Sequence, residues 1–190
     1  HGLAPLRLSP SLSLTGFPVR ARLTSLSVHE AVHMSVPFPS LAFLQTLQSA
    51  MQHDAARFCR LGFIDTTFGM HIAAPNGQHW RYLLTFEVFD CREITEVREF
   101  DLPAIDFVIT GDLAAWTEML QNIQQHHGAD VTHSLNTLTH FGERMTIAYD
   151  DPDNRDKFFR FQESIQEFFN LAQALDLDFP SIDLSTLARG

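Results

Sequence analysis

The chain has 190 residues, of which 45% are hydrophobic and 19% are charged. This composition suits one folded domain and excludes wholesale disorder. The formal net charge of -10 opposes binding to nucleic acid and to anionic membranes, because both are negatively charged. The longest apolar run has four residues, too few for a transmembrane helix or for the core of a signal peptide. We therefore expect a soluble, cytoplasmic protein without stable membrane insertion.

The N-terminal segment has its own composition. Its first 29 residues contain no Asp or Glu but carry arginines and serines, as targeting segments do. The start at His1-Gly2, without an initiating Met, favours instead an added leader followed by an extended arm. We expect residues 1–39 to be an N-terminal arm and residues 40–190 to be a single domain. The arm can be a native segment, a targeting segment or in part an added leader.

An amphipathic helix is predicted after the arm. Ser40 follows two prolines and can cap a helix, which Gly62 would end. Apolar residues recur between them at helical spacing: Leu44, Leu47, Met51, Ala55 and Phe58.

Alternating apolar residues then predict two strands, around 64–72 and 80–88. Pro75-Asn76-Gly77 suits a three-residue loop, in which Pro starts a type I turn and Gly takes the left-handed position. A two-residue turn would pair apolar with polar residues and scramble the faces, so the pattern favours the longer loop. The predicted pairs are Ile72 with Trp80, Met70 with Tyr82, and Phe68 with Leu84.

Further strands are predicted at 94–99 and 105–110. Asp112 can cap the next helix, which has a stripe of apolar residues and would stop at Gly128. Cys59 and Cys91 are expected to be free, buried thiols, which fits a reducing compartment.

The C-terminal part predicts a second hairpin from residues 135–141 and 144–149. Asp151-Pro152 then opens a long helix whose apolar seam is rich in Phe. The predicted fold class is mixed α and β (α/β in the broad sense, α+β in the strict one). We expect a mainly antiparallel sheet of about five strands that is covered by helices.

Residues 104–172 run in the order strand, Gly-Asp turn, Trp-bearing helix, strands and long helix. The segments Asp106-Phe-Val-Ile-Thr-Gly-Asp112 and Met145-Thr-Ile-Ala-Tyr-Asp150 resemble the C-terminal half of a sterol carrier protein type-2 domain. The helix and hairpin of residues 40–89 fit the opening of that family, so the resemblance spans about residues 40–175. Glu143-Arg144 departs from the basic-apolar pair usual in the family.

The resemblance implies a non-catalytic carrier that holds a sterol, fatty acyl chain or similar lipid in a hydrophobic cavity between sheet and helices. Such a ligand leaves water at about 25 cal/mol per Å², so its pocket needs apolar lining more than placed charges. Each candidate also suits an ordinary core position. The expected ligand-binding residues are Phe86, Val88, Phe107, Trp116, Leu120, Leu138, Phe158, Phe161, Ile165 and Phe168.

A rival motif lies in the arm. His29-Glu30-Ala31-Val32-His33 matches H-E-x-x-H, in which two His bind zinc and Glu activates water. Pro37 limits that helix to about two turns, and no third-ligand motif follows. We expect no cofactor, with zinc on His29 and His33 of a zinc-dependent hydrolase as the alternative.

The rest of the sequence contains no nucleophile elbow and no Gly-rich phosphate loop, so no catalytic residues are predicted. Two other hypotheses stay open: a small-molecule enzyme that uses the same apolar cavity, and an interaction module whose pocket is vestigial.

Overall fold

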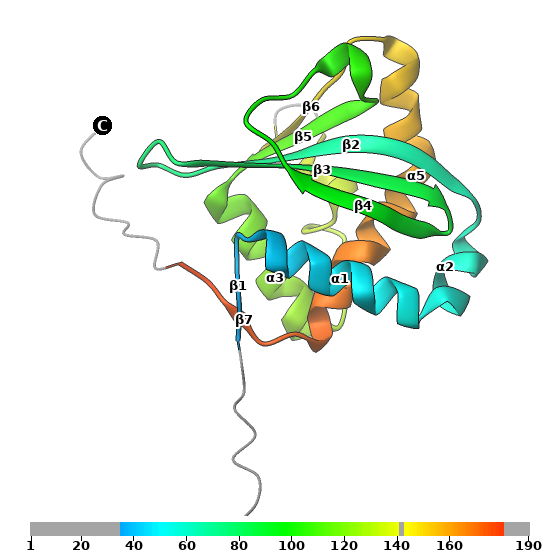
Figure 1. Ribbon diagram of the computed structural model, residues 1–190. Coiled ribbons are helices and arrows are strands. Elements are labelled where there is room, and N and C mark those ends of the chain that lie inside the picture. The colour runs from blue at the N-terminus through cyan, green and yellow to red at the C-terminus, as the bar shows by residue number, and fades with distance from the viewer. Residues whose placement is uncertain (1–34, 141–142, 181–190) are drawn as a thin grey trace, which may run out of the picture. The chain divides into compact units, whose positions relative to one another are not determined.

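The computed structural model describes residues 35–140 and 143–180, and its main feature is a five-stranded sheet in the order β4-β3-β2-β5-β6 (Figure 1). Only the β2–β5 pair is parallel, and the other three pairs are antiparallel. The predicted α+β class with a mainly antiparallel sheet is therefore confirmed. The strands are β2 (Ile64–Ala73), β3 (His79–Val88), β4 (Asp90–Glu96), β5 (Phe107–Asp112) and β6 (Met145–Ala148).

The hairpin of β2 and β3 has the predicted register. Ile72 lies opposite Trp80, Met70 opposite Tyr82, and Phe68 opposite Leu84. Gly77 has a φ of 83°, the left-handed conformation that the three-residue loop requires.

The predicted strand at 94–99 begins earlier, at Asp90, and ends at Glu96. The strand predicted at 105–110 runs instead from Phe107 to Asp112, because Leu102–Ala104 forms a short 3-10 helix, η1, just before it.

Two helices replace the single one predicted between Ser40 and Gly62. They are α1 (Leu41–His53) and α2 (Ala55–Leu61). Ser40 caps α1 as expected, since its Oγ accepts the Phe43 N–H at 3.0 Å. Asp54 breaks the run: its N–H still donates to carbonyls of α1, but its own φ and ψ are not helical.

The other two long helices begin where predicted. Asp112 caps α3 (Leu113–His126) by accepting the Ala115 N–H, and Asp151 caps α5 (Pro152–Asn170) by accepting the Asp153 N–H. His127, in the left-handed region with a φ of 60°, ends α3 just before Gly128. A 3-10 turn, η2 (Leu171–Ala174), follows α5.

The predicted second hairpin is wrong. Residues 135–138 form a short helix, α4 (Leu135–Leu138), rather than a strand. Ser134 caps this helix by accepting the Thr137 N–H. β6 therefore pairs with β5 alone and forms an edge of the described sheet.

Helices α1, α3 and α5 cover one face of the sheet (Figure 1), and the apolar residues of both hairpin strands point toward them. A separate two-stranded parallel pair joins β1 (Val36–Pro37) to β7 (Leu177–Asp178). No helix among the described residues is long and apolar enough to cross a bilayer.

Candidate functional site

The ten residues predicted to bind ligand lie on strands β3 and β5 and on helices α3, α4 and α5. Nine of them are buried in one core, and only Val88, at the end of β3, is exposed, to 42%. The buried nine come from β3 (Phe86), β5 (Phe107), α3 (Trp116 and Leu120), α4 (Leu138) and α5 (Phe158, Phe161, Ile165 and Phe168).

Phenylalanine rings fill the space between α5 and the sheet. Phe68 on β2 stacks between Phe86 and Phe107, with centroid distances of 5.8 and 5.2 Å. From α5, Phe158 meets Phe107 edge to face at 5.6 Å, and Phe168 meets Phe86 in the same way at 5.2 Å. The sequence-based list omits Phe68, the centre of this layer, although the strand alternation had already placed its side chain on the inner face.

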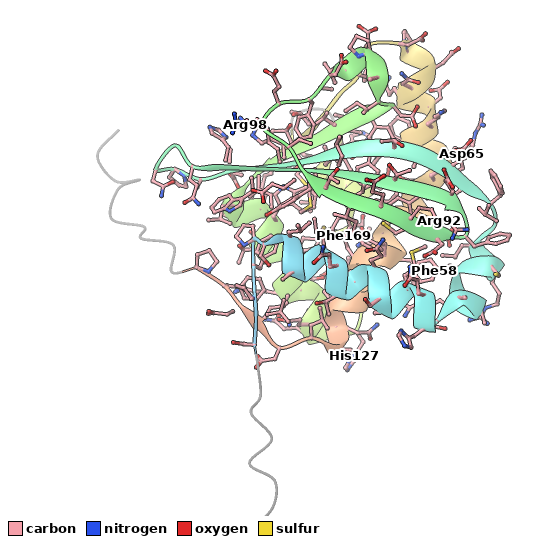
Figure 2. All side chains as sticks on the ribbon, viewed as in Figure 1. Phe58, Asp65, Arg92, Arg98, His127 and Phe169 are labelled. Atoms are coloured by element: carbon pink, nitrogen blue, oxygen red, sulfur yellow. The ribbon has the colours of Figure 1, made fainter. Side chains whose placement is uncertain are left out.

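The exposed member, Val88, lines a hollow between the first two helices and the connection from β3 to β4. The hollow has a volume of about 290 Å³. Figure 2 labels Phe58 on α2 and Arg92 on β4 at this end of the protein. Its lining consists of Met51, Gln52, Ala55, Cys59, Val88, Phe89, Asp90 and Arg92.

Part of the lining of this hollow is apolar. Met51 belongs to the buried core, so the hollow reaches the outer surface of that core. The exposed ring of Phe63 packs at 6.5 Å against Phe89, which lines the hollow. Val88 has a φ of 64°, a conformation that a β-branched residue rarely adopts.

Polar groups near the hollow come mainly from β4. Arg92 pairs with Asp90 at 3.5 Å and lies 4.0 Å from Glu87. Cys59 is exposed, so the prediction that it is buried is wrong, whereas Cys91 is buried as expected. Burial, with a smaller contribution from Asp90, raises the pKa of the Cys91 thiol, so the thiol stays protonated.

A second hollow, of about 520 Å³, lies beside the edge strand β6 and the start of α5. Its lining includes Ile147, Tyr149 and Phe159, and the guanidinium of Arg155 lies 5.2 Å from the centre of the Phe159 ring. None of the ten predicted residues lines this hollow.

The H-E-x-x-H motif, with His29, Glu30 and His33, lies outside the described residues. Within residues 35–140 and 143–180, no three His, Cys, Asp or Glu side chains gather closely enough to hold a metal ion. His133, on the loop after α3, is engaged by two carboxylates, those of Asp130 and Glu118.

The fold resembles solved structures, although no family model and no curated protein sequence matches the chain. A conserved hypothetical protein of Thermus thermophilus, described as a candidate sterol carrier protein, aligns over 73% of this chain and 90% of its own, with 16% identity and a TM-score of 0.55. A sterol carrier protein 2 aligns over 70% of this chain and 95% of its own, with 15% identity and a TM-score of 0.53. The chain therefore has the sterol carrier protein 2 fold.

Proposed function

We propose that this protein binds one apolar small molecule, a sterol, fatty acyl chain or similar lipid, and carries it through water. The fold likeness supports this function, because both similar structures are described as established or candidate sterol carriers. The observation that carries the proposal is the hollow beside Val88, whose floor is the buried core residue Met51.

The hollow is the entrance in this proposal, and the phenylalanine layer is the site. The hollow has a volume of about 290 Å³, just below the range of roughly 300 to 1,000 Å³ that is usual for ligand pockets. A lipid tail therefore needs further space deeper in the core. Met51 can move aside because its side chain is unbranched and flexible. In this proposal two rings move first to make that space. They are Phe86, two residues before Val88 on β3, and its edge-to-face partner Phe168.

Two neighbouring alanines of α2 allow a matched test. Ala55 lines the hollow and Ala56 does not, although both are exposed. We expect Ala55→Trp to weaken binding of a fluorescent fatty acid at least tenfold, because the indole fills the entrance, while Ala56→Trp binds like the wild type. Equal binding by both variants would remove the hollow from the path.

An interaction module with a filled core is the second candidate, favoured by the edge-to-face packing of the rings. Native mass spectrometry of the purified protein, together with fatty acid and sterol titrations, separates the two. A wild-type protein that carries no lipid and takes up neither probe would overturn the carrier function.

A further inference from the structure

Two histidines meet on the sheet face that points away from the core. His71 on β2 and His79 on β3 are diagonal neighbours, since His71 pairs with Arg81 and His79 with Ala73. The His71 Nε2 and His79 Nδ1 atoms are 3.0 Å apart, and the ring centroids are 5.1 Å apart. One ring therefore donates a hydrogen bond to the other.

His71 is held in place from several sides. Its Nδ1 lies 3.4 Å from the hydroxyl of Thr110 on β5, and its ring meets the edge of Phe100 at 6.2 Å. Gly69 allows this packing, because a Cβ there would lie 2.6 Å from the Phe100 ring. The Trp116 indole N–H also donates to the His71 carbonyl at 3.2 Å. His71 is thus a positioned side chain, whereas His79 is exposed and can turn.

We propose that His71 and His79 bind a divalent transition-metal ion of the class that imidazole prefers, such as Zn²⁺, Ni²⁺ or Cu²⁺. Zinc–nitrogen bonds of about 2.0–2.1 Å in tetrahedral geometry place two nitrogen ligands about 3.3 Å apart. The 3.0 Å separation is close to this value. A small rotation of the His79 ring directs both lone pairs at one ion, once the ring that donates the hydrogen bond carries its proton on its other nitrogen.

Two imidazole ligands alone make an exchangeable metal site. Both rings bind metal in their neutral form. Among the described residues no third His, Cys, Asp or Glu completes the set, so water fills the remaining positions. The site is separate from the hollow, because Val88 and His79 lie at opposite ends of β3, about 30 Å apart at 3.3 Å per residue.

The test uses the full chain with His29→Ala and His33→Ala, two substitutions that remove the rival histidine pair in the arm. This background protein is titrated with ZnCl₂ and with NiCl₂ in a calorimeter. We expect one site per chain in this background. His79→Gln or His71→Gln should weaken binding at least tenfold, and the control His53→Gln, an exposed histidine of α1, should leave it unchanged.

Copper bound to the background protein should show electron paramagnetic resonance splitting from two nitrogen ligands, and His79→Gln should reduce it to one. Circular dichroism checks that each variant is folded, and His79→Gln is the safer variant because its side chain is exposed. Absence of binding in the background protein, or binding that survives His79→Gln unchanged, would overturn the proposal.

Discussion

Phe86 on β3 and Phe168 on α5 meet edge to face, with 5.2 Å between ring centroids and 86° between ring planes. Both side chains are fully buried, and Phe168 also packs against Phe169 at 5.5 Å. Phe168→Ala removes this ring and leaves a cavity, so we expect the free energy of unfolding to fall by about 3–5 kcal/mol. Urea denaturation followed by circular dichroism measures the loss.

Phe159→Ala on the same helix is the matched control. Phe159 is 40% exposed, so its removal should cost about 1 kcal/mol or less. Equal losses in the two variants would mean that the ring layer does not stabilise the fold as its packing indicates.

Asp106 joins three elements through one carboxylate. Its Oδ2 accepts from the Thr66 hydroxyl at 2.8 Å and the Thr67 N–H at 3.0 Å, and its Oδ1 accepts from Lys157 at 2.8 Å. Asp106→Ala leaves the buried Thr66 hydroxyl without its acceptor, so we expect a loss of about 2 kcal/mol in the free energy of unfolding.

Lys157→Met removes only the partly exposed ion pair and should cost about 0–1 kcal/mol. Thermal and urea unfolding of both variants test this order. A larger effect at Lys157 than at Asp106 would contradict it.

The sequence predicted the β2–β3 hairpin to the residue because its determinants are local. Alternation with period two fixes which side chains share a face, and Gly77 fixes the loop length. The three helix caps at Ser40, Asp112 and Asp151 were predictable for the same reason, since each cap uses an N–H two or three residues away.

The strand predicted at residues 135–141 was wrong because this short segment fits both the helical and the strand period. Leu135 and Leu138 are spaced by three, as in a helix, and Ser134 supplies the cap, but the neighbouring Thr137 and Thr139 favour a strand. The break at Asp54 was equally hidden, because the apolar stripe continues on both sides of it.

The candidate site was harder to predict than the fold. Sequence periodicity identifies inward-facing residues such as Phe68 and Phe86, but their ring geometry depends on contacts across the sheet and with α5. The hollow beside Val88 forms where helices α1 and α2 meet the β3–β4 connection, and no local pattern encodes the volume left between them.

The contacts of His133 predict that the free energy of unfolding depends on pH. Its Nδ1 donates to Asp130 at 2.8 Å and its Nε2 to Glu118 at 3.3 Å, while Arg144 pairs with Glu118. The hydrogen bond to Asp130 contributes most to raising the pKa of His133, burial opposes the rise, and Glu118 adds to it. This stabilisation is fully present below the unfolded value of about 6.5 and is lost as the pH rises through the higher folded value.

Urea unfolding of the wild type and of His133→Gln at about pH 5.5 and about pH 8.5 measures this effect. We expect the wild type to be more stable than the variant at the lower pH and the difference to shrink at the higher pH. A difference that is constant, or that grows with pH, would show that the imidazolium is not stabilised by these carboxylates.

The backbone conformation of Val88 predicts that replacing it with glycine stabilises the fold. Its φ of 64° costs a β-branched residue about 1–2 kcal/mol, and glycine adopts this conformation without that penalty. Val88→Gly also loses some side-chain packing and gains disorder in the unfolded chain, so we expect a net increase of up to about 1 kcal/mol in the free energy of unfolding.

Val131 is the control for this substitution. It is 83% exposed and does not have a positive φ, so Val131→Gly should lose about 0.5–1 kcal/mol. Thermal and urea unfolding measure the change in the free energy of unfolding, and we expect this change to have opposite signs in the two variants. The reason is that, of the two valines, only Val88 is held in the left-handed region, where the chain passes tightly from β3 into β4. Equal destabilisation would mean that the side chain of Val88, through its packing at the rim of the hollow, contributes more than its backbone conformation costs.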